Sequence, residues 1–126
     1  MIMVTRILVG LLGALFLVLA FGLWFNTVAE AAKLGLSGLS IAGHATVRAD
    51  IAGFFLTGGG IAVYGAIKRN AALLWPVLLL LVSAIAGRFL TLVLNGGDGS
   101  SYPPMIVEAV GILLILYCQR SWHKAA

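Results

Sequence analysis

The sequence predicts an all-α integral membrane protein, a four-helix bundle formed by one transmembrane domain over residues 1–126. Hydrophobic residues make up 62% of the chain and charged residues 10%, with a mean hydropathy of +1.12, a balance far from that of soluble domains. The hydrophobic residues also form long blocks separated by short polar stretches, whereas a soluble helix keeps them on one face. Both observations indicate that the blocks are membrane spans.

Four blocks have the length of a span. A hydrocarbon core of about 30 Å requires about 20 helical residues at a rise of about 1.5 Å each. Blocks of that order run from Ile7 to Phe25, from Arg48 to Ile67, from Ala71 to Leu94 and from Pro104 to Gln119. Polar or glycine-rich turns separate the last three blocks. A short amphipathic helix is expected over Thr27 to Leu34, in the longer loop between the first two spans.

Positive charge near the span ends predicts the orientation, because Lys and Arg are enriched in cytoplasmic loops. One side of the predicted bundle carries Arg6, Lys68, Arg69, Arg120 and Lys124, and the other carries Lys33 and Arg48. We therefore expect both termini in the cytoplasm and the longer loop outside. The first span is expected to be retained, since its apolar run exceeds the about 7 to 15 residues of a secretory signal core.

Amphipathic side chains predict where the membrane surfaces lie. Tryptophan rings prefer the interface between lipid and water. Trp24 is therefore expected at the outer interface, and Trp75 and Trp122 at the inner one. Arg48 is expected to extend to the outer lipid phosphates.

Three charged residues inside the spans require partners. Asp50, Arg88 and Glu108 would each cost about 2.5 to 3.5 kcal/mol alone at mid-bilayer. Helical spacing places them at similar depths in the outer half of the bundle, so one guanidinium could bind both carboxylates. Such a cluster is either an ion-pair network that fixes the helix register or a binding site, and both alternatives stay open.

Polar and small residues predict which helix faces point inward. Thr57 shares a face with Asp50 and Gly53, and Thr91 and Asn95 share one with Arg88. Small residues at a spacing of four let helix backbones approach closely in lipid. The predicted packing positions are Gly53, Gly58, Ala62, Ala66, Ser83 and Gly87.

Several classes of function are disfavoured by the residues. The positive residues are scattered, without the basic stripe that follows a phosphate backbone, so no nucleic acid is expected. Cys118 is the single cysteine, and His44 and His123 are expected on opposite sides of the membrane, so we expect no metal site. No complete catalytic or nucleotide-binding motif is present. We therefore expect no cofactor and no enzymatic activity.

Four stretches of the chain form a recognisable set: Ala49-Asp50-Ile-Ala-Gly53-Phe-Phe, Gly87-Arg88-Phe-Leu, Leu94-Asn-Gly-Gly and Val107-Glu108. With these stretches the chain resembles a family of small bacterial four-helix inner-membrane proteins known only as a domain of unknown function. The resemblance implies that Asp50, Arg88 and Glu108 are signature positions, and it implies no activity. The chain departs from the family at Ala52, where a second glycine is common, and at Asn95, where an aspartate is common.

The sequence leaves two alternative functions open. The first is an accessory or structural subunit of a membrane complex or homo-oligomer, favoured by small-residue helix faces and the lack of catalytic residues. The alternative is a binder or carrier of a lipid, quinone or small cation, in a polar pocket of the outer half of the bundle. The expected partners are membrane lipids and other membrane subunits or further copies of the chain.

Overall fold

The computed structural model describes residues 1–97, 99–100 and 102–125, and every regular element in these ranges is helical. Four helices are long and apolar enough to cross a membrane: Ile2–Phe25, Ile41–Lys68, Ala71–Asn95 and Tyr102–Trp122. The elements, in chain order, are α1 (Ile2–Phe25), α2 (Thr27–Lys33), α3 (Ile41–Thr46), the π-helical turn η1 (Val47–Ile51), α4 (Ala52–Lys68), the 3₁₀ turn η2 (Ala71–Leu73), α5 (Leu74–Asn95) and α6 (Tyr102–Ala125).

Three spans begin earlier than the sequence predicted, the fourth by only two residues, at Tyr102 rather than Pro104. The first begins at Ile2 rather than Ile7, since the polar Thr5 hydroxyl donates to the Ile2 carbonyl at 2.9 Å and is thereby satisfied within the helix. The second begins at Ile41 rather than Arg48, because α3, η1 and α4 run on as one rod. Ser40 caps this rod by accepting a hydrogen bond from the Gly43 amide at 3.0 Å.

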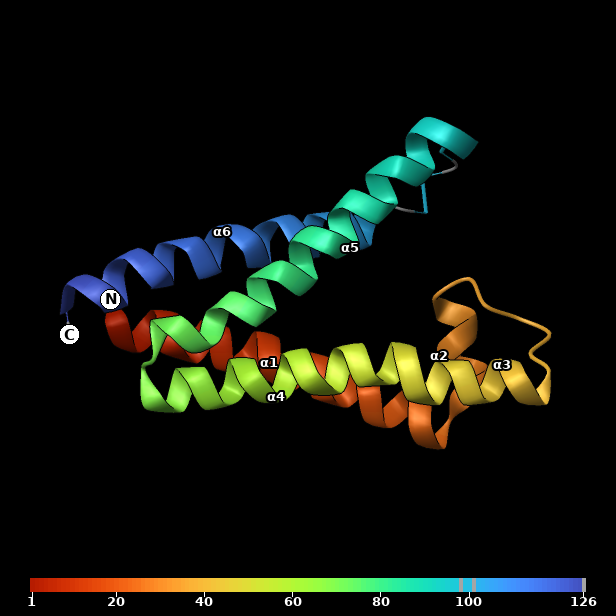
Figure 1. Cartoon of the computed structure of the whole chain (residues 1–126), viewed down its shortest axis with the longest axis horizontal. Coiled ribbons are helices and arrows are strands. Elements are labelled where there is room, and N and C mark those ends of the chain that lie inside the picture. The colour runs from red at the N-terminus through yellow and green to blue at the C-terminus, as the bar shows by residue number, and fades with distance from the viewer. Residues whose placement is uncertain (98, 101, 126) are drawn as a thin grey trace.

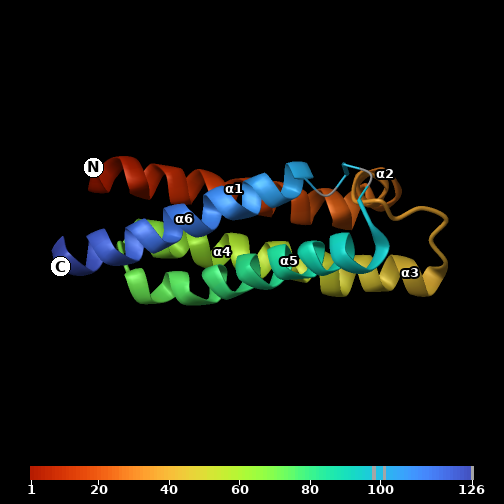
Figure 2. The same ribbon diagram turned by 90° about the horizontal axis from the view of Figure 1, so that it is seen from above.

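The helices form two pairs that meet at one end of the molecule. Both termini lie at the end that we call the terminal end, and α2 and α3 lie at the opposite loop end (Figures 1 and 2). The pair of α1 and α4 packs most closely, and α5 with α6 forms the second pair. Figure 1 shows α5 diverging from α4 toward the loop end. The bundle is therefore packed at the terminal end and open at the loop end.

Two glycines let α1 and α4 pack so closely. A Cβ added at Gly59 would lie 2.7 Å from the Gly13 carbonyl oxygen, and one added at Gly13 would lie 2.7 Å from the Gly59 carbonyl oxygen. Real Cβ atoms do not approach backbone oxygens this closely, so only glycine fits at either position. Close backbone approach of this kind drives helix association in lipid, where apolar burial gives no net gain.

The predicted packing positions divide into two groups. Gly58, Ala62 and Ala66 are buried between helices. By contrast, Ser83 and Gly87 are exposed on α5, and a Cβ added at Gly53 or Gly87 would meet no atom within 4 Å. These last three residues do not mediate close packing within the chain, contrary to the prediction, because the faces that carry them point away from the neighbouring helices.

The core at the terminal end contains the indole of Trp122. This side chain is 1% exposed and its Nε1 donates to the Thr5 hydroxyl at 3.0 Å. The sequence placed Trp122 at the membrane surface, and the structure buries it because Thr5 satisfies its N–H inside the bundle. Trp75, in contrast, is 56% exposed at the same end.

Arg6 links α1 to the end of α4. It donates from Nε to the Ala66 carbonyl at 2.7 Å and from Nη2 to the Ile67 carbonyl at 2.8 Å.

A smaller contact at the loop end joins α1 to η1. Trp24 Nε1 donates to the Arg48 carbonyl at 2.9 Å, and Arg48 Nε donates to the Trp24 carbonyl at 3.1 Å. Leu23, Ala31, Val47 and Ala52 pack behind this exchange. The α1–α4 pair is therefore held at both ends and at its middle, whereas α5 has no such contact with α4 at the loop end.

The glycine contact predicts a sharp difference between neighbouring substitutions. Gly59→Ala should lower the free energy of unfolding by about 1–3 kcal/mol, as overpacking does in other cores, because its methyl group meets the Gly13 carbonyl. Gly60→Ala is the matched control, since a Cβ there meets no atom within 4 Å. Denaturant titration in bicelles, followed by circular dichroism, measures both values, and equal stability of the two variants would contradict the packing described.

Candidate functional site

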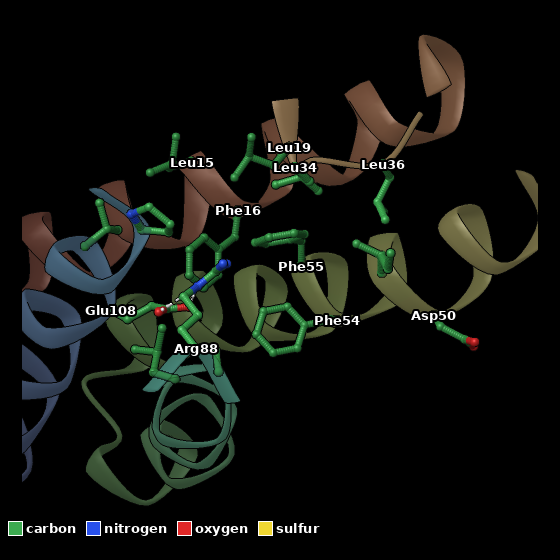
Figure 3. A pocket seen from close by; sticks show the side chains of 15 residues that line it. Leu15, Phe16, Leu19, Leu34, Leu36, Asp50, Phe54, Phe55, Arg88 and Glu108 are labelled. Atoms are coloured by element: carbon green, nitrogen blue, oxygen red, sulfur yellow. Dashed lines mark hydrogen bonds and ion pairs between the residues drawn. The ribbon is translucent and has the colours of Figure 1, made fainter. Parts of the chain in front are cut away.

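A cavity of about 580 Å³ lies between the two helix pairs, where α5 diverges from α4. Residues from α1, the segment after α2, the η1–α4 rod, α5 and α6 line it (Figure 3). We call it the cleft. Its lining residues are Leu15, Phe16, Leu19, Leu34, Leu36, Asp50, Ile51, Phe54, Phe55, Leu81, Ala84, Arg88, Pro104, Val107 and Glu108.

Three phenylalanine rings form the wall of the cleft on the α1–α4 side. Phe16 and Phe55 meet edge to face with centroids 5.3 Å apart, and Phe54 and Phe55 do the same at 5.1 Å. Such T-shaped contacts fix the orientation of the rings. Because Phe16 comes from α1 and the other two come from α4, the close α1–α4 pair positions this apolar wall.

The opposite wall carries an ion pair between α5 and α6. Arg88 Nε lies 3.1 Å from Glu108 Oε1 and donates to Oε2 at 3.2 Å. The side chain of Glu108 is 10% exposed and that of Arg88 is 35% exposed. Both residues lie about two helical turns from the loop end of their helices, so they meet at the same level. The pair satisfies two charges that would each be costly alone at this depth in hydrocarbon.

Most donors of Arg88 remain available to the cleft. A guanidinium has five N–H donors, and Glu108 engages only the one on Nε. Within the described ranges, Nη1 and Nη2 donate to no protein acceptor. In Figure 3 the tip of the guanidinium extends past Glu108, on the side of Phe16 and Phe55. An otherwise apolar cleft therefore contains one concentrated set of hydrogen-bond donors.

Asp50 does not join the ion pair, contrary to the sequence prediction. Its side chain is exposed, and Figure 3 shows its carboxylate turned away from Arg88 and Glu108 at the edge of the cleft. The cause is local: Asp50 lies in the π-helical turn η1. A π turn has a wider hydrogen-bond spacing than an α-helix, so the face inferred from a regular helical period does not continue from α4 into this turn.

The other predicted polar positions, unlike Asp50, do not line the cleft. Thr57 is exposed on α4, and Asn95 is exposed at the end of α5. Thr91 is exposed and its hydroxyl donates to the Gly87 carbonyl at 3.0 Å, so its polar group is satisfied within its own helix. Thr91 and Asn95 belong to the last two turns of α5, the end of the helix that diverges from α4 in Figure 1.

The aromatic wall was not predicted from the sequence. A phenylalanine in an apolar span can face either the lipid or the core of the bundle. The spacing of phenylalanines in such a span does not distinguish a lipid-facing position from a core position. A usable signal was the pair Phe54-Phe55, which follows Asp50 by four and five residues in a glycine-rich span. An aromatic pair of this kind fills the space that small neighbours leave open.

Within the part of the chain that the structure describes, no group of three His, Cys, Asp or Glu side chains could hold a metal ion. Comparison of the chain with known protein families, curated proteins and solved structures gives no match. The site combines an apolar cavity, an ion pair and the unused donors of Arg88.

The ion pair predicts opposite outcomes for single and double substitutions. Glu108→Leu should lower the free energy of unfolding by about 1–3 kcal/mol, below the about 3–5 kcal/mol of fully buried pairs, since Arg88 is partly exposed. Combining it with Arg88→Met should restore most of the loss, because no unpaired charge then remains in the bundle. Thermal unfolding in detergent measures both.

The control for this pair is Lys33→Gln. Lys33 Nζ forms an ion pair with Glu30 Oε1 at 3.0 Å, outside the four spans, and 71% of the lysine side chain is exposed. The substitution should therefore lower the free energy of unfolding by at most about 1 kcal/mol. A double variant as unstable as Glu108→Leu alone would show that the charges are not coupled.

Proposed function

We propose that this protein is a non-enzymatic membrane protein that binds a lipid-like amphiphile in the cleft. The observation that carries the proposal is the juxtaposition of an apolar cavity of about 580 Å³ with one set of unused donors on Arg88. Ligand sites generally have about 300–1,000 Å³, mostly apolar walls and few polar groups. The cleft has all three properties.

The surrounding lipid limits what can give such a site its affinity. A hydrocarbon tail gains little by moving from lipid to an apolar wall, because lipid tails are equally apolar. Selective binding must therefore come from the fit to the phenylalanine wall and from hydrogen bonds at Arg88. A molecule with both a tail and a polar head matches this division, whereas a small polar ion would leave the wall unused.

We further propose that the terminal end faces the cytoplasm of a bacterial cell, so that the cleft opens in the outer half of the cytoplasmic membrane. Arg6, Lys68, Arg69 and Arg120 lie at the terminal end, and Lys33 and Arg48 lie at the loop end. This distribution fits the excess of positive charge in cytoplasmic loops. A ligand would then enter from the outer leaflet.

A second candidate function is that of an accessory subunit that associates with another membrane helix or with a copy of itself. The favouring observation is the exposed face of α5, where Ser83 and Gly87 are four residues apart and a Cβ at Gly87 would meet no atom. Small residues at this spacing allow a second helix to approach closely. Ser83 and Gly87 do not line the cleft, so the two functions are compatible.

Filling the cleft tests the first function. Ala84→Phe places a ring inside the cleft, and it should lower affinity about tenfold, because the ring takes the place of the tail and removes its fit to the phenylalanine wall. Ala86→Phe is the matched control, since Ala86 is exposed on the same helix and does not line the cleft. Photolabelling with a diazirine-bearing long-chain ester in nanodiscs reports binding. Equal labelling of both variants would exclude the cleft as the site.

The second function is tested on the exposed face of α5. Gly87→Leu should reduce self-association in liposomes about tenfold, because it removes the close approach. Gly10→Leu serves as the control, since a Cβ at Gly10 also meets no atom but Gly10 lies on α1. Single-molecule photobleaching counts the copies per liposome, and a chain that remains monomeric throughout would argue against self-association.

A further inference from the structure

We infer that the head of the bound amphiphile is uncharged and carries carbonyl oxygens, and that Glu108 imposes this preference by neutralising Arg88. The inference rests on the proposed function of the cleft and specifies its ligand. It excludes ligands that an isolated arginine would be expected to select, namely carboxylates, sulfonates and phosphates.

The donors of Arg88 require an oxygen acceptor from the occupant. Both Nη atoms lie at a level where hydrocarbon offers no acceptor, and no described protein group supplies one. Unpaired N–H groups are costly in such surroundings. An alkane would fill the apolar part of the cleft but leave these donors unpaired. A head with carbonyl oxygens satisfies them, and a planar guanidinium can donate to two acceptors side by side.

The charge of the ion pair decides between a neutral and an anionic head. Arg88 and Glu108 together carry no net charge, with Nε in contact with both carboxylate oxygens. An anion at the Nη atoms would be attracted by Arg88 and repelled by Glu108 across the same guanidinium, so the repulsion offsets part of the attraction. The anion would still lose its hydration on entering the cleft. A neutral acceptor has no comparable hydration to lose and keeps the hydrogen bonds.

A cationic head is excluded by the same arrangement. Arg88 repels it, and the Glu108 carboxylate is already occupied by Arg88 Nε and only 10% exposed. Asp50 is the other acid at the cleft, and its carboxylate turns away from the cavity. Neither acid is therefore presented to a cation inside the cleft.

The depth of Arg88 supports the same conclusion independently. Arg88 lies seven residues before Asn95, the last residue of α5, so its backbone is about 10 Å from the loop end of that helix. A head bound there lies below the layer of lipid phosphates. Charged heads are costly at that depth, whereas the carbonyl of an ester or a quinone is tolerated. The shared chemistry of the ligand is thus a neutral carbonyl head with a long apolar tail.

Competition among matched probes tests this inference on the full chain. The protein is placed in nanodiscs of ether-linked phosphatidylcholine, which lacks ester carbonyls, and labelled with a diazirine derivative of methyl hexadecanoate. The competitors are methyl hexadecanoate, a decyl-substituted benzoquinone, hexadecanesulfonate, hexadecyltrimethylammonium and hexadecane. At least one of the two carbonyl probes should compete at about tenfold lower concentration than the charged probes and hexadecane. Which of them is stronger distinguishes an acyl ester from a quinone.

Two variants separate the roles of the paired residues. Glu108→Gln removes the repulsion but keeps the shape, so hexadecanesulfonate should gain about tenfold relative to methyl hexadecanoate. Arg88→Gln removes most of the donors, so the advantage of the ester over hexadecane should disappear. Arg120→Gln, on the exposed face of α6, should leave the wild-type ranking unchanged.

The outcomes distinguish failure of the inference from failure of the function. If the sulfonate or the ammonium probe competes best in the wild-type chain, the cleft binds amphiphiles but the charge argument is wrong. If peptides that line the cleft are labelled no more than the rest of the chain, the proposed function itself fails. The wild-type ranking needs no variant, so it stands even if Glu108→Gln does not fold.

Discussion

The pairing of Arg88 with Glu108 is the constraint on which the second half of the chain depends. Hydrocarbon provides no water for either charge, so α5 and α6 must be neighbours at the level where the two side chains meet. The pair links the two helices near the loop end. It thereby places a neutral but donor-rich group on one wall of the cleft.

The cleft results from two different ways of joining helices. Backbone approach at Gly13 and Gly59 makes α1 and α4 a close pair that presents Phe16 and Phe55. The second pair is joined to the first chiefly by the core at the terminal end, around Trp122. Because nothing comparable joins α5 to α4 at the loop end, the two pairs diverge there. The same divergence that opens the cavity also exposes the donors of Arg88 to it.

The features that the bilayer requires, namely the long apolar helices and the paired charges, were predictable from the sequence. The features that depend on local backbone geometry were not. Four long apolar helices are confirmed, since the thickness of the bilayer fixes their length. The contact of Arg88 with Glu108 was predictable from the cost of a lone charge. The position of Asp50 was predicted wrongly, because no pattern in the sequence predicts the π-helical turn in which it lies. Small residues were ambiguous for another reason. Gly59 at a helix contact and Gly87 on an exposed face have the same kind of spacing, so periodicity does not tell them apart.

A density map of the full chain in lipid nanodiscs tests the central claim most directly. The account predicts that the two helix pairs remain apart at the loop end, with Arg88 in contact with Glu108 and an elongated density along Phe16 and Phe55 that ends at the guanidinium. A map in which α5 and α6 pack against α4 along their whole length, leaving no space beside Arg88, would contradict it.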